Sequence, residues 1–500
     1  MLRVSSFRCA FRKLSRTEGV EGFHRVNARF QSPPLGSLPL KALDNSTGTP
    51  SPKHWEENWD DDSLRTAMRD HALLTWGVTQ GADKLPILVD GEGPYLIDTE
   101  GKRYLDWTSQ AVCANFGYDV PQAVLDAVQR QLRTVPYSYG GMGTTPVRAK
   151  LSSLMAEICP GNLNGFLFPC GGGEANEAAI RMARRFTGKH KIVTQYRSYH
   201  GGSTTGLGAT GDFRRWFAEA GATGFVKVFN PQPIGFSWGH TDESACERAL
   251  QSLEETILME GPDSIAAMLL EPVVGAGGCL IPPTNYMQGV RALCDKYNML
   301  MICDEVMMGF FRTGPLFAFQ HFDGVLPDIV TSAKGLTGAY LPLAMVAVRQ
   351  PIKEFFETNP LGWGATYHAH PVAVACAYEC VKHMFKEDFR GKVAALQPVM
   401  IEGIHQLAER HPSVLQGRAI GMFGCLDLRD KTGCLAQQLH QPMRNEIKEL
   451  KGALLDKGII GLLRPPFLHC CPPLIISKEQ LREGFDLVSA ALAETLDKSL

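Results

Sequence analysis

The chain has 500 residues, of which 44% are hydrophobic and 20% charged, and its formal net charge is −2. This composition is typical of a globular protein with a sizeable core, and the length predicts two or three domains. The sequence has no uninterrupted apolar window of about 18 residues, which argues against a membrane-spanning helix. The weak net charge, without a long basic run in the body of the chain, argues against nucleic acid or anionic membrane as a partner.

The first thirty residues differ in composition from the rest of the chain. Residues 1–30 are rich in arginine and serine, and no acidic residue precedes Glu18. This composition predicts a mitochondrial presequence and hence a location in the mitochondrial matrix; a disordered basic tail is the alternative. Residues 31–53 are rich in Pro, Ser, Gly and Thr, and we interpret them as a leader or linker.

A glycine run joins the first predicted strand to the first predicted helix of the cofactor region. The strand covers residues 163–168, the run is Gly171–Gly173, and the helix covers residues 174–186. Backbone N–H groups at the start of a helix bind phosphate well, although a tight turn would also use these glycines. The spacing fits neither a mononucleotide P-loop nor a dinucleotide fingerprint. A single phosphate on a small cofactor is the remaining hypothesis.

Polar residues follow the ends of several further predicted strands. The strands cover residues 191–196, 265–270, 301–304, 329–333 and 343–348, and they alternate with helices. This alternation predicts an α/β fold with a mostly parallel sheet. The polar residues that follow are Tyr199, His200, Glu271, Asp304 and Lys334. Because the carboxyl ends of parallel strands form one edge, we expect these side chains to share a ligand site.

Lys334 and Asp304 are the candidate catalytic pair. A lysine at the end of a buried strand must be neutralised, paired or used covalently. Lysine can hold an aldehyde cofactor as a Schiff base, and a carboxylate can keep a pyridine nitrogen protonated. With the phosphate cradle and Tyr199 stacked on the ring, the set fits pyridoxal 5′-phosphate (PLP), and Val306 would pack the opposite face. A purely structural Tyr-His-Gly turn is the alternative for Tyr199. An ordinary buried Lys–Asp pair is the alternative reading.

From about residue 385 the pattern becomes helix, strand and helix, which predicts a second, smaller domain. Its strand-like segments are residues 418–422 and 468–476. The fourteen cysteines lie scattered in apolar segments, as expected for reduced thiols. Cys376, Cys380 and His383 have helical spacing but lack a fourth ligand, so we predict no metal site.

Several segments, in this order, are similar to those of a known family. They are 171–177 (GGGEANE), 199–201 (YHG), 271–275 (EPVVG), 304–306 (DEV), 312–314 (RTG), 333–335 (AKG) and 365–367 (ATY). The chain resembles the class III PLP-dependent aminotransferases over roughly residues 70–495. The amino-acid sequences of these segments are most similar to those of the branch of taurine–pyruvate and related ω-amino acid:oxo-acid transaminases.

The resemblance implies a fold type I enzyme with a large PLP-binding domain and a small domain built from both chain ends. We place the large domain at residues 116–384 and the small domain at residues 54–115 and 385–500. The resemblance also implies a homodimer with shared active sites, in which Thr366 reaches the phosphate bound by the neighbouring subunit.

The resemblance assigns roles to the residues at the strand ends. Lys334 would carry the cofactor and move the proton, and Asp304 would pair with the pyridinium nitrogen. The Gly172 and Gly173 amides would hold the phosphate. The other residues expected around the cofactor are Tyr199, His200, Glu271, Val306 and Thr366.

Two departures from the family pattern concern the cofactor. Relatives commonly have hydroxyl residues where Gly171 and Gly173 stand, and many have a glutamine that touches the cofactor where this chain has Met307. Each lost hydrogen bond to a charged phosphate costs about 1.5–3 kcal/mol unless backbone amides replace it.

Substrate recognition is expected to involve Arg464. A guanidinium there would bind a carboxylate or sulfonate bidentately, with Glu271 as its partner when no substrate is bound; a surface arginine is the alternative. His469 stands where many relatives have a carboxylate-binding arginine. Trp107 and Phe116 are candidates for the entrance, with core packing as the alternative.

These features predict transfer of an amino group from a primary ω-amine to an oxo acid. The donor would be taurine, β-alanine or 4-aminobutyrate, and the acceptor pyruvate, glyoxylate or 2-oxoglutarate. A decarboxylase or aminomutase on the same scaffold is one alternative, and a PLP-binding module without turnover is another.

Overall fold

The computed structural model describes residues 59–76, 78–217, 221–233, 236–431 and 444–500. The predicted presequence, residues 1–30, and the predicted leader, residues 31–53, lie outside this part of the chain. Contacts group the residues into two compact units, one ending at Ile87 and the other starting at Leu88. The three-part division that we predicted, at 54–115, 116–384 and 385–500, stays a prediction.

The first unit contains α2 (Asp61–His71) and η1 (Ala82–Lys84). Helix α2 begins after Asp60, whose carboxylate accepts a hydrogen bond from the Ser63 N–H at 2.9 Å. Such a side-chain cap satisfies one of the N–H groups that a helix start leaves without a partner.

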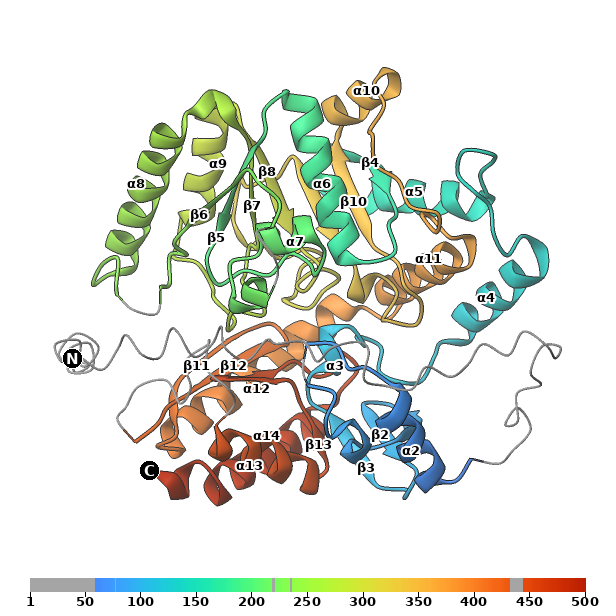
Figure 1. The fold of residues 1–500 in the computed structure, drawn as a ribbon, viewed down its shortest axis with the longest axis vertical. Helices are drawn as coiled ribbons and strands as arrows, with labels where there is room; N and C mark the ends of the chain where they lie inside the picture. Colours follow the sequence, from blue (N-terminus) through green and yellow to red (C-terminus); the bar gives the residue numbers. More distant parts are fainter. Residues whose placement is uncertain (1–58, 77, 218–220, 234–235, 432–443) are drawn as a thin grey trace, which may run out of the picture. The chain divides into compact units, whose positions relative to one another are not determined.

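The second unit is organised around a seven-stranded sheet with the order β4-β10-β9-β8-β7-β5-β6 (Figure 1). In sheet order the strands are β4 (Leu163–Leu167), β10 (Met345–Arg349), β9 (Ile329–Ser332), β8 (Leu300–Asp304), β7 (Ile265–Leu270), β5 (Lys191–Gln195) and β6 (Phe225–Val228). Strand β10 runs antiparallel to both of its neighbours, whereas the pairings from β9 through β6 are parallel. The predicted α/β fold with a mostly parallel sheet is confirmed.

Alternate residues of the central strands enter two separate hydrophobic cores. In β7, Ala267 and Leu269 pack in the core that contains the alanine face of α6 (Gly172–Thr187), whereas Met268 and Leu270 face the other core. Successive side chains of a strand point to opposite faces, so the sheet is covered on both sides. This burial explains why the strands read as continuous apolar runs.

The remaining helices of this part connect and cover the strands. The longer ones are α4 (Gln122–Thr134), α5 (Pro146–Ile158), α8 (Asp242–Glu260), α9 (Tyr286–Lys296), α10 (Gln350–Thr358) and α11 (Pro371–Lys386). The short ones are α3 (Ser109–Val112), α7 (Thr204–Ala209), η2 (Phe213–Phe217), η3 (Pro262–Ser264), η4 (Ala318–His321) and η5 (Lys334–Leu336). Helix α9 packs on β8 and on α8.

Two four-stranded sheets complete the second unit. The first has the order β1 (Leu88–Glu92), β2 (Tyr95–Asp98), β3 (Arg103–Asp106) and β13 (Ile459–Ile460). The second has the order β11 (Val414–Ile420), β12 (Phe423–Leu428), β15 (Phe467–Cys470) and β14 (Leu463–Arg464). Strand β13 pairs in parallel with β3, so segments from the two ends of this unit share one sheet.

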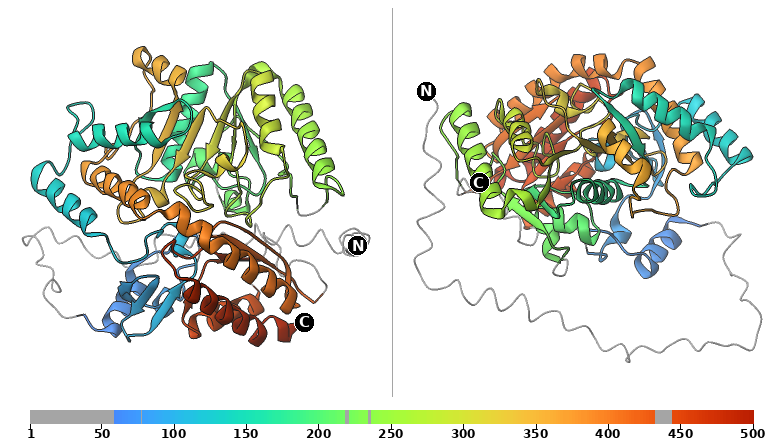
Figure 2. Two further views of the ribbon diagram at one scale, coloured as in Figure 1. Left: turned by 180° about the vertical axis from the view of Figure 1, so that it is seen from behind. Right: turned by 90° about the horizontal axis from the view of Figure 1, so that it is seen from above.

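The C-terminal helices are α12 (Phe389–Arg410), α13 (Asn445–Asp456), α14 (Lys478–Glu494) and η6 (Asp497–Ser499). Helices α12 and α14 pack against each other (Figures 1 and 2). The strand predicted at residues 418–422 is wrong in extent. It spans the turn of the β11–β12 hairpin at Gly421, where φ is +57°, a value that suits glycine.

Arg312 fastens both ends of the unit to the loop after β8. Its guanidinium is fully buried and donates to the Met422 and Pro472 carbonyl oxygens at 3.0 and 2.6 Å. It also donates to Ser109 Oγ at 3.0 Å and to Asn115 Oδ1 at 2.8 Å. A buried guanidinium needs such acceptors, so the RTG segment is explained by packing.

Candidate active site

Strands β8 and β9 bring the two predicted catalytic residues to one edge of the sheet. Asp304 is the last residue of β8 and pairs in register with Thr331 of β9. Lys334 follows β9 after a single further residue and starts η5. Its φ of +38° is unusual for a lysine, and such left-handed conformations gather at functional sites.

The Asp304 carboxylate is buried and accepts three hydrogen bonds. Oδ2 accepts from Asn176 Nδ2 at 2.7 Å and lies 2.8 Å from His200 Nδ1, while Oδ1 accepts from the Val306 N–H at 3.0 Å. Because each carboxylate oxygen has two lone pairs, Oδ1 keeps one acceptor position for a further donor. A pyridinium N–H is a donor of the required kind.

Asn176 is a site residue that sequence reasoning missed. It lies on α6, and its Nδ2 donates to the His200 carbonyl oxygen at 2.9 Å as well as to Asp304. Its Oδ1 accepts from Thr331 Oγ1 at 2.7 Å. Asn176 therefore links α6, the loop after β5, β8 and β9. Its place inside the GGGEANE segment was the available signal.

The Lys334 amine is suited to covalent use. Burial lowers its pKa, and the nearby positive charge of Arg464 acts in the same direction, whereas Cys113, Asp304 and Glu271 oppose the shift. Within the described ranges, no hydrogen bond or ion pair engages its Nζ. A buried amine with a lowered pKa is available as a nucleophile or base.

The glycine run forms the first turn of α6, two residues earlier than the predicted helix start. A Cβ on Gly172 would lie 2.6 Å from Val306 Cγ1, so a side chain there would require Val306 to move. A Cβ on Gly201, where φ is +136°, would lie 2.8 Å from the Gly173 Cα. The predicted cradle therefore touches the YHG turn through closely approaching backbone and touches Val306 through the valine side chain.

Glu271 holds two backbone segments beside Asp304. Its Oε1 accepts from the Tyr199 N–H at 3.1 Å and its Oε2 from the Gly275 N–H at 2.8 Å. Burial raises the pKa of Glu271 to about 7, and the Asp304 charge adds to this, while His200 and the two N–H groups oppose it. In the same loop, a Cβ on Gly275 would lie 2.1 Å from Met307 Sδ, so Met307 packs against the glycine backbone.

Arg464 lies in β14 and faces this cluster. Burial lowers its pKa to about 10, and Arg214 adds to this, whereas Asp212, Tyr199 and Glu271 oppose it. Glu271 interacts with Arg464 through its charge, as expected, but the two form no direct ion pair, because no carboxylate of the described residues lies within 4.0 Å of the guanidinium. The Glu271 oxygens accept from backbone N–H groups instead.

Trp107 and Phe116 do not line the entrance. Trp107 is fully buried and packs edge-on against Phe485 of α14, with ring centroids 5.1 Å apart. Phe116 is 3% exposed and stacks on Tyr340. Both are core residues, which corrects the prediction that Trp107 binds substrate.

Thr366 lies in a different surrounding from the other predicted residues. It is exposed, and its carbonyl oxygen accepts from Tyr137 Oη at 2.8 Å. The neighbouring side chains of Tyr137, Tyr139, Met142 and Tyr367 are also exposed, by 39–90%. Among the described residues, no hydrogen bond or ion pair joins Thr366 to Lys334.

The model of one protein family, "Aminotransferase class-III", matches residues 78–492. The chain belongs to the class III aminotransferases. A putrescine–pyruvate aminotransferase of Pseudomonas aeruginosa is 31% identical over 82% of the chain and 91% of its own length. A taurine–pyruvate aminotransferase of Rhodobacter capsulatus is 33% identical over 81% and 91% of the two chains.

Solved transaminase structures have the same fold. A taurine:2-oxoglutarate aminotransferase from Bifidobacterium kashiwanohense, in complex with PLP and glutamate, has a TM-score of 0.83 and 35% identity, covering 89% of this chain and all of its own. An ω-transaminase from Thermomicrobium roseum has a TM-score of 0.82 and 34% identity over 88% of this chain. The predicted fold type I, PLP as cofactor and PLP-dependent transamination are confirmed.

The residues of this aminotransferase fit PLP. Gly172 and Gly173 supply N–H groups at the start of α6, Asp304 Oδ1 has an acceptor position, and Lys334 has an unengaged amine beside a buried carboxylate. The orphaned Nε2 of His200 is a further polar atom that lies buried at the site. We propose no metal ligand, and among the described residues no three His, Cys, Asp or Glu side chains cluster as a metal site requires.

We assign no catalytic role to two other features of the aminotransferase, a Ser–His–Asp set and a small cavity. Ser489 Oγ lies 2.7 Å from His411 Nε2, and His411 Nδ1 lies 2.6 Å from Asp497 Oδ2. Ser489 is inside α14, where neighbouring N–H groups are used by the helix, so this Ser–His–Asp set lacks oxyanion donors.

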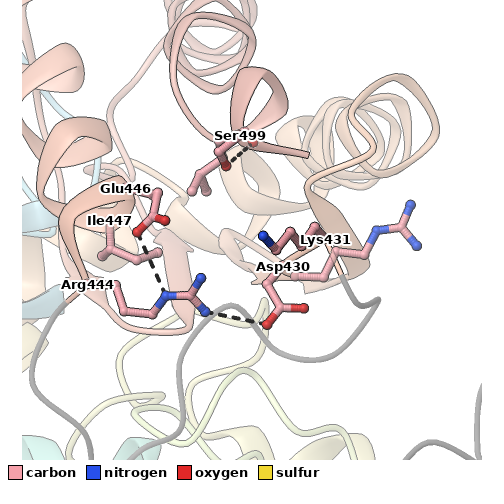
Figure 3. Close-up of a pocket in the computed structure, with 8 residues that line it drawn as sticks. Asp430, Lys431, Arg444, Glu446, Ile447 and Ser499 are labelled. Carbon is pink, nitrogen blue, oxygen red and sulfur yellow. Dashed lines mark hydrogen bonds and ion pairs between the residues drawn. The ribbon is translucent and has the colours of Figure 1, made fainter.

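A cavity of about 80 Å³ lies apart from Lys334. It is lined by Arg429, Asp430, Lys431, Arg444, Glu446, Ile447, Leu496 and Ser499 (Figure 3).

No described helix of the aminotransferase is both long and apolar enough to cross a membrane. The cysteines of the described residues are free, and most are buried. Cys376 and Cys380 lie with their Sγ atoms 3.9 Å apart inside α11.

Proposed function

We propose that the enzyme transfers the amino group of a primary amine with a distal acid group to an oxo acid. Taurine, β-alanine and 4-aminobutyrate are the candidate donors, and pyruvate, glyoxylate and 2-oxoglutarate the candidate acceptors. The names of similar enzymes, which include taurine with pyruvate or 2-oxoglutarate, support this choice.

Arg464 is the observation that carries the substrate proposal. Its guanidinium is largely buried, lies near Lys334 and Glu271, and has no carboxylate partner within ion-pairing distance in the described part of the chain. A buried charge without a partner is costly, and a guanidinium binds carboxylate or sulfonate bidentately. An anionic group on the substrate would supply the missing partner.

The reaction needs a proton to be moved at the donor carbon. When bound, PLP supplies an electron-withdrawing pyridinium ring that stabilises negative charge at that carbon. The Asp304 carboxylate, fixed by Asn176, His200 and the Val306 N–H, would keep the ring nitrogen protonated. Lys334 would take the proton from the carbon and return it, because its lowered pKa makes the neutral amine available.

The lysine assignment is tested with Lys334→Ala. The purified variant should lose the visible absorption band of covalently held PLP and at least about 10³-fold of kcat, since the proton-transfer group is removed. Full turnover in this variant would refute the assignment.

The substrate assignment is tested with Arg464→Gln. We expect KM for taurine and β-alanine to rise by roughly 10- to 100-fold, the effect of losing a charged hydrogen bond, while KM for a neutral primary amine changes little. Equal losses for both kinds of donor, or a clear preference of the wild type for putrescine, would contradict the distal-acid proposal.

We also infer a homodimer and a mitochondrial location. The exposed aromatic surface beside Thr366 supports the first, because exposed apolar patches mark contact surfaces. The composition of residues 1–30 supports the second. Light scattering of the wild type and of Tyr367→Lys tests the dimer, and a monomeric wild type would reject that inference.

Import of a reporter fused to residues 1–30 into mitochondria tests the location. A reporter that stays outside the organelle would reject the mitochondrial inference.

A further inference from the structure

A short turn packs against the Tyr199-His200 segment from outside the sheet. Thr210 Oγ1 accepts from the His200 N–H at 3.0 Å, and the Gly211 N–H donates to the Ser198 carbonyl oxygen at 3.0 Å. The turn then leads into η2, whose second residue is Arg214.

The Arg214 guanidinium lies over the Tyr199 ring. Its Cζ is 3.6 Å from the ring centroid, well inside the roughly 6 Å over which a cation is attracted to an aromatic face. The Tyr199 N–H is meanwhile held by Glu271 Oε1 at 3.1 Å. The tyrosine is thus restrained at its backbone and on one face of its ring.

Asp212 fixes the guanidinium in this position. Arg214 Nε donates to Asp212 Oδ2 at 2.8 Å and to Oδ1 at 3.1 Å, and Nη2 forms an ion pair with Oδ2. The Arg214 N–H also donates to Oδ1 at 2.9 Å. The side chains of Arg214 and Asp212 are only 8% and 11% exposed. Because this pair is shielded from solvent and joined by several hydrogen bonds, the guanidinium of Arg214 keeps a fixed plane. An exposed ion pair would not fix its plane in this way.

We propose that Arg214, clamped by Asp212, is a positioning residue that sets the plane of the Tyr199 ring against the PLP ring. This inference rests on the proposed role of Tyr199 as the aromatic side chain that stacks on the cofactor. Arg214 itself touches neither the reacting atoms nor the cofactor in this role. Lysine cannot replace it, because an ammonium on a flexible stem has no plane to stack.

The test compares Arg214→Lys and Arg214→Met with the same changes at Arg215. Arg215 is the next residue of η2, and its guanidinium lies 5.8 Å from the ring centroid of Tyr196 and not over Tyr199, so it is a matched control. Apoprotein is titrated with PLP, and the visible circular dichroism of the loaded protein is recorded, because this signal reports the orientation of the bound ring.

Both Arg214 variants should weaken PLP binding by about 3- to 30-fold, the range for losing a desolvated cation–aromatic contact. They should also change the visible circular dichroism at saturating PLP and lower kcat more than the KM for the amine donor. Both Arg215 variants should match the wild type in all three measurements. Asp212→Asn keeps the side-chain volume and should give an intermediate change.

A merely structural role for Arg214 would show differently. The Arg214 variants would then melt at lower temperature, yet bind PLP with unchanged circular dichroism once loaded, and this result would overturn the inference. Equal effects of the Arg214 and Arg215 changes would also overturn it. If the wild-type protein itself does not bind PLP, the proposed function fails instead, which the titration of the wild type shows separately.

Discussion

Three consecutive glycines open α6, and their surroundings differ. A Cβ on Gly171 would meet no atom within 4 Å, whereas a Cβ on Gly172 would collide with Val306. Gly171 is the N-cap of α6, with an extended backbone that any residue adopts, and it makes no side-chain cap. Only Gly172 is required by close packing against the cofactor residues.

Replacing these glycines should therefore have opposite effects. Gly171→Ser adds a hydroxyl at the N-cap of α6, next to the glycines that would hold the phosphate, so PLP binding should tighten by roughly tenfold. Gly172→Ala should weaken PLP binding and lower the melting temperature, because its methyl group needs Val306 to move. Titration of apoprotein with PLP measures both, and tighter binding by Gly172→Ala would contradict the packing argument.

At the level of single residues, the sequence indicated the candidate catalytic pair more clearly than the residues that hold this pair in place. Asp304 and Lys334 could be selected because each follows an apolar strand and has a functional group with few structural uses there. Asn176 and Thr331 could not, because an amide in a helix and a hydroxyl in a strand are common. Their role depends on the 2.7 Å contacts between elements that only folding brings together.

Among the elements, the loop from Glu271 to Cys279 is fastened from two sides. Arg197, in the loop after β5, donates to the Gly277 carbonyl oxygen at 2.6 Å. Arg418 of β11 donates to the Gly278 carbonyl oxygen at 2.7 Å and is itself held by Asp427. The C-terminal sheet, which also carries Arg464, is thereby tied to the loop that holds Glu271.

Arg418→Met should loosen this connection. The Gly278 carbonyl and Asp427 would lose their donor, so we expect a loss of about 3–5 kcal/mol of stability together with a raised KM for the anionic donor. Arg349→Met is the control, because Arg349 pairs with Asp328 at the opposite end of the central strands. It should lower stability without changing KM. Denaturant melts and donor kinetics measure the two effects, and an unchanged KM in Arg418→Met would reject the coupling.

The elements of the central sheet were predicted more closely than those of the C-terminal sheet. Strand β7 matches its predicted range because an apolar run buried on both faces has clear limits. The segment predicted at 468–476 is strand only to Cys470, since beyond it two prolines remove the donors that pairing needs. Pairing of β12 with β15 joins distant residues, and no local pattern indicates such a partner.

For the whole molecule, Glu305 is a group that couples stability to pH. It is fully buried next to Asp304, and its Oε1 accepts from the Phe319 N–H at 2.8 Å. Burial raises its pKa from 4.5 to about 8, and the Asp304 charge acts in the same direction. The folded state binds this proton more tightly than the unfolded state, so Glu305 lowers stability progressively as pH rises from about 4.5 to 8.

Glu305→Gln should remove this penalty, because glutamine has the shape of the protonated acid. The variant should exceed the wild type in stability by on the order of 1–3 kcal/mol above pH 8, and the difference should vanish below about pH 4.5. Melting curves from pH 4 to pH 9 measure it. Glu357→Gln, a change in the exposed pair with Lys353, should give no such trend. A wild type that is more stable than the variant at pH 9 would contradict the argument.

The sequence by itself predicted the α/β fold and the cofactor, and it singled out Asp304 and Lys334 as the candidate catalytic pair. Short segments are enough to predict these properties, because the properties depend on local features. These features are a buried strand, a glycine-rich helix start and the side chain at the end of a strand. The tertiary structure decided which groups surround that pair. It placed Trp107 in the core, gave the Glu271 carboxylate two backbone N–H partners, and set Arg214 on Tyr199. Each of these outcomes depends on contacts between residues that are distant in sequence or lie in separate loops. Hydrophobic periodicity predicts local helices and strands, so it cannot indicate such contacts.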